Sequence, residues 1–298
     1  MTFIGAVCNG KGGVGKTFVS VNICAALAAS GKKVCLIDLC PSRESTNYLD
    51  MTEVDNSTDE LNIFEALRCE LPIEYVMLPT KWKNFFLVRG SEKMSDLDSS
   101  LIGEPNQYTC VSEFLKSKAL KGFDFVFMDT APNFTVTTGA ALAAADGFFM
   151  PVFPEKSSVS GMSNQMMRIS KIRKHANKNL EFMGLIINKY EKSSATHSEI
   201  IDIFNTISIG QGFRIYKPYL PNALKSVSTS SYKSEPIVFD KPHLPIGKSL
   251  QSLTSEIVLS VDEKLNKKKT GRPKKPIDHK AFAVLDRAFT SPETHNAQ

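Results

Sequence analysis

The sequence predicts an α/β fold in which a doubly wound, mostly parallel sheet is followed by a basic C-terminal tail. First, apolar runs of strand length alternate with stretches of helical spacing, a pattern typical of parallel sheets that helices cover on both faces. Second, a glycine-rich loop at residues 10–17 joins the first apolar run to the first helical stretch. Third, the 298 residues have a net charge of +5 that is concentrated near the C-terminus.

The predicted elements alternate along the chain. In order, we expect strands at residues 3–8, 34–38, 85–88, 123–129, 147–153, 182–188 and 213–216. Helical spacing predicts helices at residues 17–30, 60–69, 111–120, 135–145, 160–175 and 246–265, and we expect the polar stretches 50–60 and 90–106 to be loops. Because the core pattern stops near residue 265, the predicted parts are a domain at 1–265 and a tail at 266–298.

Composition argues against a membrane-spanning or secreted protein. The apolar content of 42% is ordinary for a globular protein, and no apolar run approaches the roughly 18 residues of a membrane-spanning helix. Because the chain begins with a predicted strand, we expect no cleaved signal peptide. The six cysteines form no C-x-x-C pair and no zinc-site spacing. Three of them, Cys8, Cys24 and Cys35, lie in apolar runs, so we expect reduced core thiols and a cytoplasmic protein.

The glycine-rich loop matches the G-x-x-x-x-G-K-[ST] pattern of a phosphate-binding P-loop and lies between a strand and a helix, as that motif requires. Glycines let backbone N–H groups turn toward phosphate oxygens, and the helix N-terminus adds a partial positive charge. We expect Lys16 to reach the β- and γ-phosphates and the Thr17 hydroxyl to hold Mg²⁺. The sequence therefore predicts a P-loop NTPase whose nucleotide contacts Gly10, Lys11, Gly12, Gly13, Val14, Gly15, Lys16, Thr17 and Phe18.

A lysine at the second position of the loop narrows this prediction. With Lys11, the segment Lys-Gly-Gly-Val-Gly-Lys-Thr resembles the deviant Walker A motif of the ParA/MinD family of P-loop ATPases, and in particular its ParA-type DNA-partitioning members. The resemblance implies ATP and Mg²⁺ as cofactors and a homodimer that forms on ATP binding. It also implies that Lys11 crosses the dimer interface to the partner's nucleotide, so the predicted catalytic residues are Lys11, Lys16 and Asp38.

An apolar strand that ends in a carboxylate follows at residues 125–129, as in a Walker B motif. At the tip of this strand, Asp129 is expected beside the P-loop, where it accepts a hydrogen bond from a Mg²⁺-bound water. The sequence Asp-Thr-Ala-Pro that begins at this aspartate resembles the endings found in the family. The predicted metal-site residues are Thr17, Asp129 and Asp38.

The second strand ends in Asp38-Leu39-Cys40-Pro41, where members of the family usually have Asp-x-Asp-Pro. Asp38 matches the first carboxylate, and Cys40 stands where the second is expected. The resemblance implies that this second carboxylate organises the attacking water and the metal, which a weakly hydrogen-bonding and mostly uncharged thiol does poorly. Three readings remain: Asp38 acts alone, hydrolysis is slow, or the cysteine is tolerated at a near-normal rate.

Two later segments resemble the parts of the family that contact the base. Asn188 ends a strand at the position of the adenine-reading segment, where an amide meets both donor and acceptor edges of the base. Pro221 lies in the segment 219–225, which resembles the loop that closes over the base. The alternative is that Asn188 only caps the strand. Lys225 falls where many ParA proteins place a basic residue that contacts DNA phosphates.

Most of the excess positive charge lies beyond the predicted domain. Residues 264–280 contain eight Lys and Arg against one acidic residue, Asp278. Within them, Gly271-Arg272-Pro273 resembles an AT-hook, in which Arg272 enters an A/T-rich minor groove while Lys274 and Lys275 neutralise phosphates. The alternative is a disordered, solubilising tail. A short amphipathic helix is expected at 279–289, docked on the core, a partner or a membrane.

A second basic set lies within the predicted domain. Arg168, Lys171 and Lys174 are spaced at i, i+3 and i+6 on one helix and so form a stripe. Such a stripe suits a phosphate backbone, and we include Lys171 among the predicted DNA contacts. A plain solvated helix face is an equally good reading.

These residues together resemble a ParA-type ATPase for plasmid, prophage or chromosome partition. The resemblance implies that the ATP dimer binds DNA non-specifically, that a ParB-like centromere-binding protein stimulates its hydrolysis, and that the protein associates with the nucleoid in the cytoplasm. The alternative is a MinD-like membrane-surface positioning ATPase, against which the AT-hook argues. An electron-transfer ATPase and an amidoligase resembling cobyrinic acid synthase fit less well, because no cluster-binding cysteine follows Asp129 and no glutaminase sequence is seen.

Overall fold

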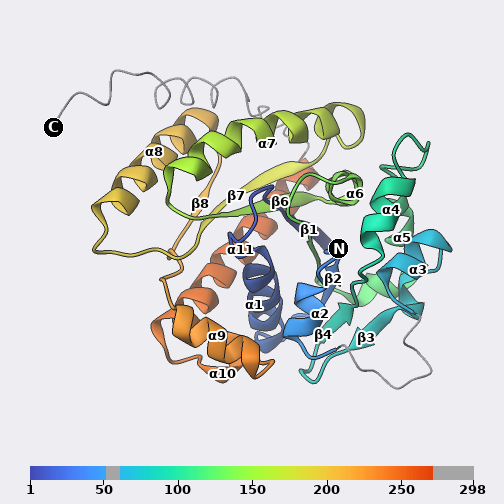
Figure 1. The fold of residues 1–298 in the computed structure, drawn as a ribbon, viewed down its shortest axis with the longest axis horizontal. Coiled ribbons are helices and arrows are strands. Elements are labelled where there is room, and N and C mark those ends of the chain that lie inside the picture. The colour runs from blue at the N-terminus through green and yellow to red at the C-terminus, as the bar shows by residue number, and fades with distance from the viewer. Residues whose placement is uncertain (52–60, 271–298) are drawn as a thin grey trace.

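The computed structural model describes residues 1–51 and 61–270, with residues 267–270 described by their backbone alone. It has one central sheet with helices on both faces (Figure 1). Every neighbouring pair of strands is parallel except β3 and β4, and the strand order is β3-β4-β2-β5-β1-β6-β7-β8. The predicted doubly wound, mostly parallel sheet is thus confirmed. Its strands are β1 (Phe3–Val7), β2 (Val34–Asp38), β3 (Met77–Pro79), β4 (Phe85–Val88), β5 (Phe125–Asp129), β6 (Gly147–Val152), β7 (Glu181–Ile187) and β8 (Ile215–Tyr216).

Each predicted strand is present, with ends that differ by at most two residues. The sequence did not predict β3, an edge strand that runs antiparallel to β4. Three residues are too few to show the alternation that marks a strand, and the proline in it is tolerated because it lies at an edge.

One face of the sheet is covered by the P-loop helix and the helices beside it. Their apolar side chains, such as Ile23, Leu27 and Leu250, are fully buried in one cluster with the side chains of that sheet face. Figure 1 shows α1 and α11 side by side across this face. The helices here are α1 (Lys16–Ala29), α2 (Glu44–Tyr48), α9 (Leu224–Tyr232), α10 (Ile237–Asp240) and α11 (Pro245–Thr270).

The other face is covered by a second set of helices with its own apolar cluster, which includes Met94, Met162 and Phe204. Figure 1 shows α7 and α8 on this side. The helices are α3 (Ile63–Arg68), α4 (Met94–Ser100), α5 (Cys110–Phe114), α6 (Val136–Ala144), α7 (Lys156–His175) and α8 (Ala195–Gln211), with short 3₁₀ turns η1 (Ile73–Tyr75) and η2 (Lys118–Gly122).

Several predicted boundaries are wrong. The expected loop at 90–106 contains α4, because Met94, Leu97 and Leu101 turn inward although their neighbours are polar. The expected helix at 111–120 is divided into α5 and η2, and α7 begins at Lys156 rather than at residue 160. Helix α11 continues to Thr270, beyond the expected end at residue 265. No helix in the described ranges is long and apolar enough to cross a membrane.

Candidate nucleotide site

A cavity of about 630 Å³ lies at the carboxyl edge of the central strands, a size typical of small-molecule sites. The P-loop and the start of α1 line one side of it, the segment after β2 lines another, and the segments after β7 and β8 complete it. The structure therefore brings together residues that are more than two hundred positions apart, such as Gly13 and Pro221. The predicted residues that line it are Gly13, Gly15, Lys16, Thr17, Phe18, Asn188 and Pro221.

The backbone of the P-loop explains two of its glycines. Gly13 and Gly15 have φ values of 73° and 87°, in the left-handed region that side chains with a Cβ rarely adopt. Gly15 also lies against the amide of Asn188, which leaves no room for a Cβ. Asn188 Nδ2 donates to the carbonyl oxygen of Val14 at 3.1 Å, so this buried amide holds the loop in place.

Asn9, the residue before the motif, anchors the loop from the other side, and the sequence analysis missed it. Its Oδ1 accepts from the backbone N–H of Lys11 at 2.8 Å and from Gln165 Nε2 at 2.8 Å. Its Nδ2 donates to the carbonyl oxygen of Pro151 at 2.7 Å. These contacts join the P-loop to β6 and α7, and no motif signals them because the partners are distant in the chain.

Four predicted loop residues do not line the cavity: Gly10, Lys11, Gly12 and Val14. The side chain of Lys11 instead extends to the start of α7 in its own chain. Its Nζ forms an ion pair with the carboxylate of Glu155 and a 2.7 Å hydrogen bond to Ser157 Oγ. The nucleotide contacts that we expected from these four residues remain predictions.

The predicted metal site contains hard oxygen donors. Thr17 Oγ1 donates to Glu44 Oε2 at 3.0 Å, at the mouth of the cavity. Asp129 lies fully buried behind it and accepts from Ser45 Oγ at 2.8 Å and from Ser20 Oγ at 3.3 Å. Burial raises the pKa of Asp129 to about 6, an effect that the hydroxyls of Thr17 and then Ser45 partly oppose. Oxygen donors of this kind, next to a phosphate-binding loop, fit Mg²⁺.

Asp38 lies next to Asp129 in the sheet, with their Cα atoms in register across β2 and β5. It is fully buried and does not line the cavity. Its carboxylate accepts from the backbone N–H of Cys40 and from the backbone N–H and hydroxyl of Thr46, at 2.8–3.1 Å. Burial, and then the charge of Asp129, raises the pKa of Asp38 to about 7. Asp38 thus holds the segment after β2 in place, and its catalytic and metal roles remain predictions.

Cys40 lines the cavity, as the residue at this position was expected to do. Its Sγ lies 3.0 Å from Ser42 Oγ, and burial raises the pKa of the thiol. The side chain is therefore neutral at physiological pH. It offers neither a negative charge nor a strong acceptor to a metal or a water.

The two predicted base-binding residues flank the cavity on the β7 side. Asn188 lines it, although its Nδ2 is engaged with the P-loop and its Oδ1 accepts from the backbone N–H of Lys189. Pro221 lines it as well, on a segment held to Tyr190 by a bridge. Adenine recognition by these residues remains a prediction. Lining residues that the sequence analysis did not single out include Glu44, Asn47, Tyr48, Thr130, Pro132, Val227, Ser231 and Ile246.

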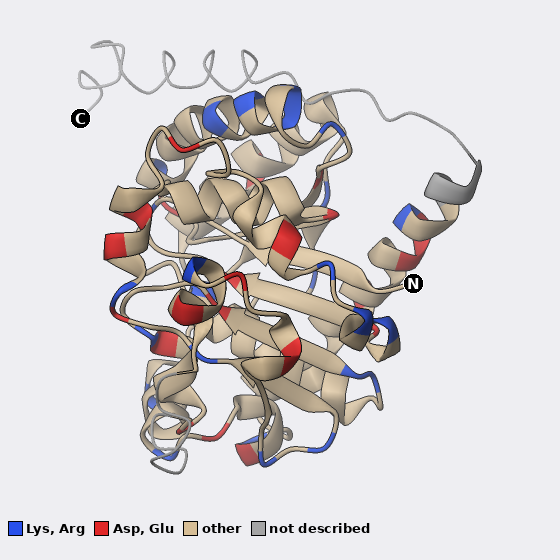
Figure 2. Ribbon diagram, turned by 90° about the vertical axis from the view of Figure 1, so that its right-hand side faces the viewer, with Lys and Arg blue, Asp and Glu red and all other residues tan. Residues whose placement is uncertain are grey.

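The two predicted DNA contacts that lie in the described part of the chain, Lys171 and Lys225, are on different helices. Arg168, Lys171 and Lys174 are exposed on α7, and ribbon segments coloured for Lys and Arg recur along the helix at the top of Figure 2. Lys225 is exposed on α9, at the opposite end of the molecule in Figure 1. Arg272, Lys274 and Lys275 lie outside the described residues, as does the expected helix at 279–289.

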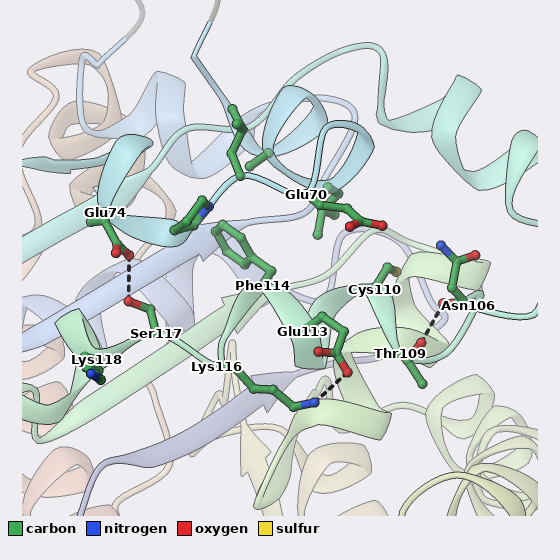
Figure 3. Close-up of a pocket in the computed structure, with 14 residues that line it drawn as sticks. Glu70, Glu74, Asn106, Thr109, Cys110, Glu113, Phe114, Lys116, Ser117 and Lys118 are labelled. Atoms are coloured by element: carbon green, nitrogen blue, oxygen red, sulfur yellow. Dashed lines mark hydrogen bonds and ion pairs between the residues drawn. The ribbon is translucent and has the colours of Figure 1, made fainter.

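A second cavity of about 630 Å³ lies between α3 and α5 and shares no lining residue with the first (Figure 3). Two pairs of its polar side chains are bound to each other: Ser117 Oγ donates to Glu74 at 2.6 Å, and Lys116 pairs with Glu113 at 2.6 Å. None of the predicted site residues lies in it. The predicted nucleotide-binding residues that line a cavity therefore line the first one.

Comparison with known sequences finds a matching family model and related partitioning proteins. A family model described as "AAA domain" matches residues 2–182, more than half of the chain. The chromosome partitioning protein ParA of Caulobacter vibrioides is 24% identical over 236 residues, which is 79% of this chain and 86% of that protein.

Comparison with solved structures shows the same fold. An ATP complex of McdA from Cyanothece has a TM-score of 0.75 at 17% identity and covers 93% of this chain and 99% of its own. Cobyrinic acid a,c-diamide synthase from Mycobacterium smegmatis, with bound ADP and magnesium, has a TM-score of 0.71 at 21% identity. The match covers 93% of this chain and 99% of that structure's chain. With the P-loop, its second-position lysine and the match over residues 2–182, the chain belongs to the ParA/MinD family of P-loop ATPases.

Proposed function

We propose that this protein is a ParA-type DNA-partitioning ATPase, which uses ATP and Mg²⁺ to form a sandwich homodimer. The observation that carries the proposal is the position of Lys11. It occupies the P-loop yet lies outside the cavity of its own chain and is about one-third exposed. A P-loop lysine that lies outside its own cavity can serve the nucleotide of a second copy once its ion pair with Glu155 opens.

In the proposed reaction, water attacks the γ-phosphate and gives ADP and phosphate. Lys16, at the start of α1, binds the β- and γ-phosphates, and the P-loop N–H groups bind their oxygens. Thr17 and Asp129 would hold Mg²⁺, which neutralises developing charge on the phosphates. Ser20 and Ser45 fix the orientation of the Asp129 carboxylate through hydrogen bonds.

Hydrolysis is slow in this proposal because Cys40 has no charge with which to orient the attacking water. Slow hydrolysis would let the ATP-bound dimer persist, so that hydrolysis times its release from DNA. ATP holds a dimer that binds DNA without strong sequence preference, and hydrolysis, stimulated by a ParB-like centromere-binding protein, releases it. The basic tail at 266–298 adds DNA affinity, and the protein acts on the nucleoid in the cytoplasm. Partition by related ParA proteins supports this assignment.

The decisive experiment measures DNA binding with ATP, with ADP and without nucleotide. We expect tight binding with ATP only, on duplexes of unrelated sequence. Flotation with liposomes under the same conditions tests the MinD-like alternative. Binding to liposomes with ATP, without binding to DNA, would replace the partition proposal with a membrane-surface one. Binding to neither would favour a biosynthetic role on the same fold.

A further inference from the structure

Glu44 lies in the nucleotide cavity, and no sequence motif draws attention to it. It is the first residue of α2, is exposed, and is the one acidic side chain among the described residues that line the cavity. Thr17 Oγ1, the predicted Mg²⁺ ligand, donates to its Oε2 at 3.0 Å. The Glu44 carboxylate is therefore close enough to Thr17 to reach a metal that Thr17 binds.

The same carboxylate is connected to Cys40. Ser42 Oγ donates to Glu44 Oε1 at 3.2 Å, and Cys40 Sγ lies 3.0 Å from the same Ser42 hydroxyl. A line of polar contacts thus runs from position 40, where a carboxylate is missing, to a carboxylate four residues later. The other nearby carboxylates, Asp38 and Asp129, are fully buried and do not line the cavity, so among the described residues Glu44 is the carboxylate that can act on the metal from the cavity side.

Electrostatics restrict what Glu44 can do there. A carboxylate that faces a di- or triphosphate repels it, unless a cation lies between the two. Lys16 is committed to the phosphates on the P-loop side. A divalent cation beside Thr17 would separate Glu44 from the phosphates and turn the repulsion into attraction.

We propose that Glu44 takes over the metal-side role of the carboxylate missing at position 40 and positions the Mg²⁺ of the nucleotide complex. It acts through the Thr17 hydroxyl and the hydration shell of the metal, so it is a positioning residue. Orientation of the attacking water is not restored by Glu44, so hydrolysis stays slow. The inference rests on the proposed ATP- and Mg²⁺-dependent function of this cavity.

The test measures the affinity for ADP by fluorescence titration, with Mg²⁺ and with EDTA, in the wild type and in Glu44→Gln. Glutamine keeps an acceptor for Thr17 and Ser42 but removes the charge. Mg²⁺ should raise the ADP affinity of both proteins. We expect Glu44→Gln to need about 10- to 100-fold more Mg²⁺ than the wild type to reach half of this increase, as for other residues that support metal ligands. In EDTA, where no divalent cation separates position 44 from the phosphates, the variant should bind ADP as tightly as the wild type or more tightly.

Two results would overturn the proposal. If Glu44→Gln binds ADP more tightly both with Mg²⁺ and with EDTA, the carboxylate only obstructs the phosphates. If the Mg²⁺ dependence is unchanged, the carboxylate has no metal role. Failure of the proposed function is distinguishable, because the wild type itself would then show no Mg²⁺-dependent binding of ADP.

Three further variants complete the experiment. Glu104→Gln, at an exposed position outside the cavity, is the matched control and should behave as the wild type. The double variant Cys40→Asp/Glu44→Gln should recover most of the Mg²⁺ dependence, because it restores a carboxylate at the other end of the polar line. Glu44→Asp, which keeps the charge on a shorter side chain, should lie between the wild type and Glu44→Gln. The fluorescence of Trp82, stacked on Phe239 with centroids 5.4 Å apart, reports whether each variant is folded.

Discussion

Lys11 of the P-loop is paired with Glu155 at the start of α7 in the same chain, and Ser157 adds a hydrogen bond. A side chain held in this way cannot reach a second protomer. Dimerisation as proposed therefore requires that this ion pair open first. Both partners are more than one-third exposed, so the pair contributes at most about 1 kcal/mol.

Removal of Lys11 and removal of Glu155 should have opposite effects on dimerisation. We expect Lys11→Ala to bind ATP but to fail to dimerise, because the cross-interface cation is lost. Glu155→Gln should release Lys11 and lower the ATP concentration needed for dimerisation by up to about fivefold. Light scattering after gel filtration with ATP measures both.

The control for Glu155→Gln is Glu113→Gln on α5, which breaks an exposed ion pair with Lys116 just beyond that helix. It should leave dimerisation unchanged. Equal loss of ATP binding and dimerisation in Lys11→Ala would show that the lysine serves its own nucleotide.

Lys16→Ala should abolish ATP-dependent dimerisation, because the β- and γ-phosphates lose their main cation. Unlike Lys11, Lys16 is buried and lines the cavity. Nucleotide affinity should therefore fall together with dimerisation, which an ATP titration monitored by fluorescence detects. Normal dimerisation of this variant would refute the assignment of the P-loop.

Cys40→Asp should raise ATP turnover. If the missing carboxylate limits how well the attacking water is oriented, restoring it should accelerate hydrolysis about tenfold, which corresponds to ~1.4 kcal/mol of the barrier. Steady-state phosphate release with saturating DNA and partner gives the rate. A wild type that is equally fast or faster would show that another group orients the water.

The stability of the nucleotide-free protein should fall as the pH rises toward 7. The pKa of Asp38 is raised to about 7 in the folded protein, so folding keeps a proton that the unfolded chain has released. The stabilisation is complete below the unfolded pKa of about 4 and is lost as the pH passes through 7, at up to ~1.4 kcal/mol per pH unit.

Urea denaturation at intervals between pH 5 and 8 measures this slope. Asp38→Asn should flatten it, because the asparagine does not titrate, whereas the exposed Glu104→Gln should not. An Asp38→Asn protein with the slope of the wild type would mean that other groups, such as Asp129, set the pH dependence.

Deleting residues 266–298 should weaken DNA binding and reduce the slope of log affinity against log salt. Each phosphate contact that is lost lowers the slope by about 0.9 on duplex DNA. Arg272→Ala should remove a preference for A/T-rich duplexes while leaving most of the non-specific binding. An unchanged slope after the deletion would leave the tail as a spacer.

The sequence was sufficient for the parts of the fold and site that depend on local spacing. The P-loop is a continuous motif, and buried parallel strands such as Val34–Asp38 are continuous apolar runs, so both could be predicted to within two residues. Edge strand β3 and helix α4 were missed because a short element surrounded by polar residues has no clear period.

Contacts across the sheet could not be predicted. Asn9 anchors the P-loop through partners on β6 and α7, and Glu44 meets Thr17 only after β2 and α1 are packed together. The sequence also could not show that the amide of Asn188 binds the carbonyl of Val14. In each case the partner depends on where distant segments come together.

Helix α11 packs beside α1 and β8 and runs from the nucleotide cavity toward the start of β7. Near its start, Ile246 lines the nucleotide cavity, and near its end, Lys264 Nζ lies 3.0 Å from the carboxylate of Glu181, the first residue of β7. The described part of the helix therefore approaches its end on the side of the sheet away from the nucleotide cavity. A DNA-binding tail attached to this end of the helix would not sense by direct contact whether ATP or ADP is bound. In the proposed dimer, nucleotide state would instead reach DNA through avidity, because ATP sets whether one tail or two are tethered to the same particle.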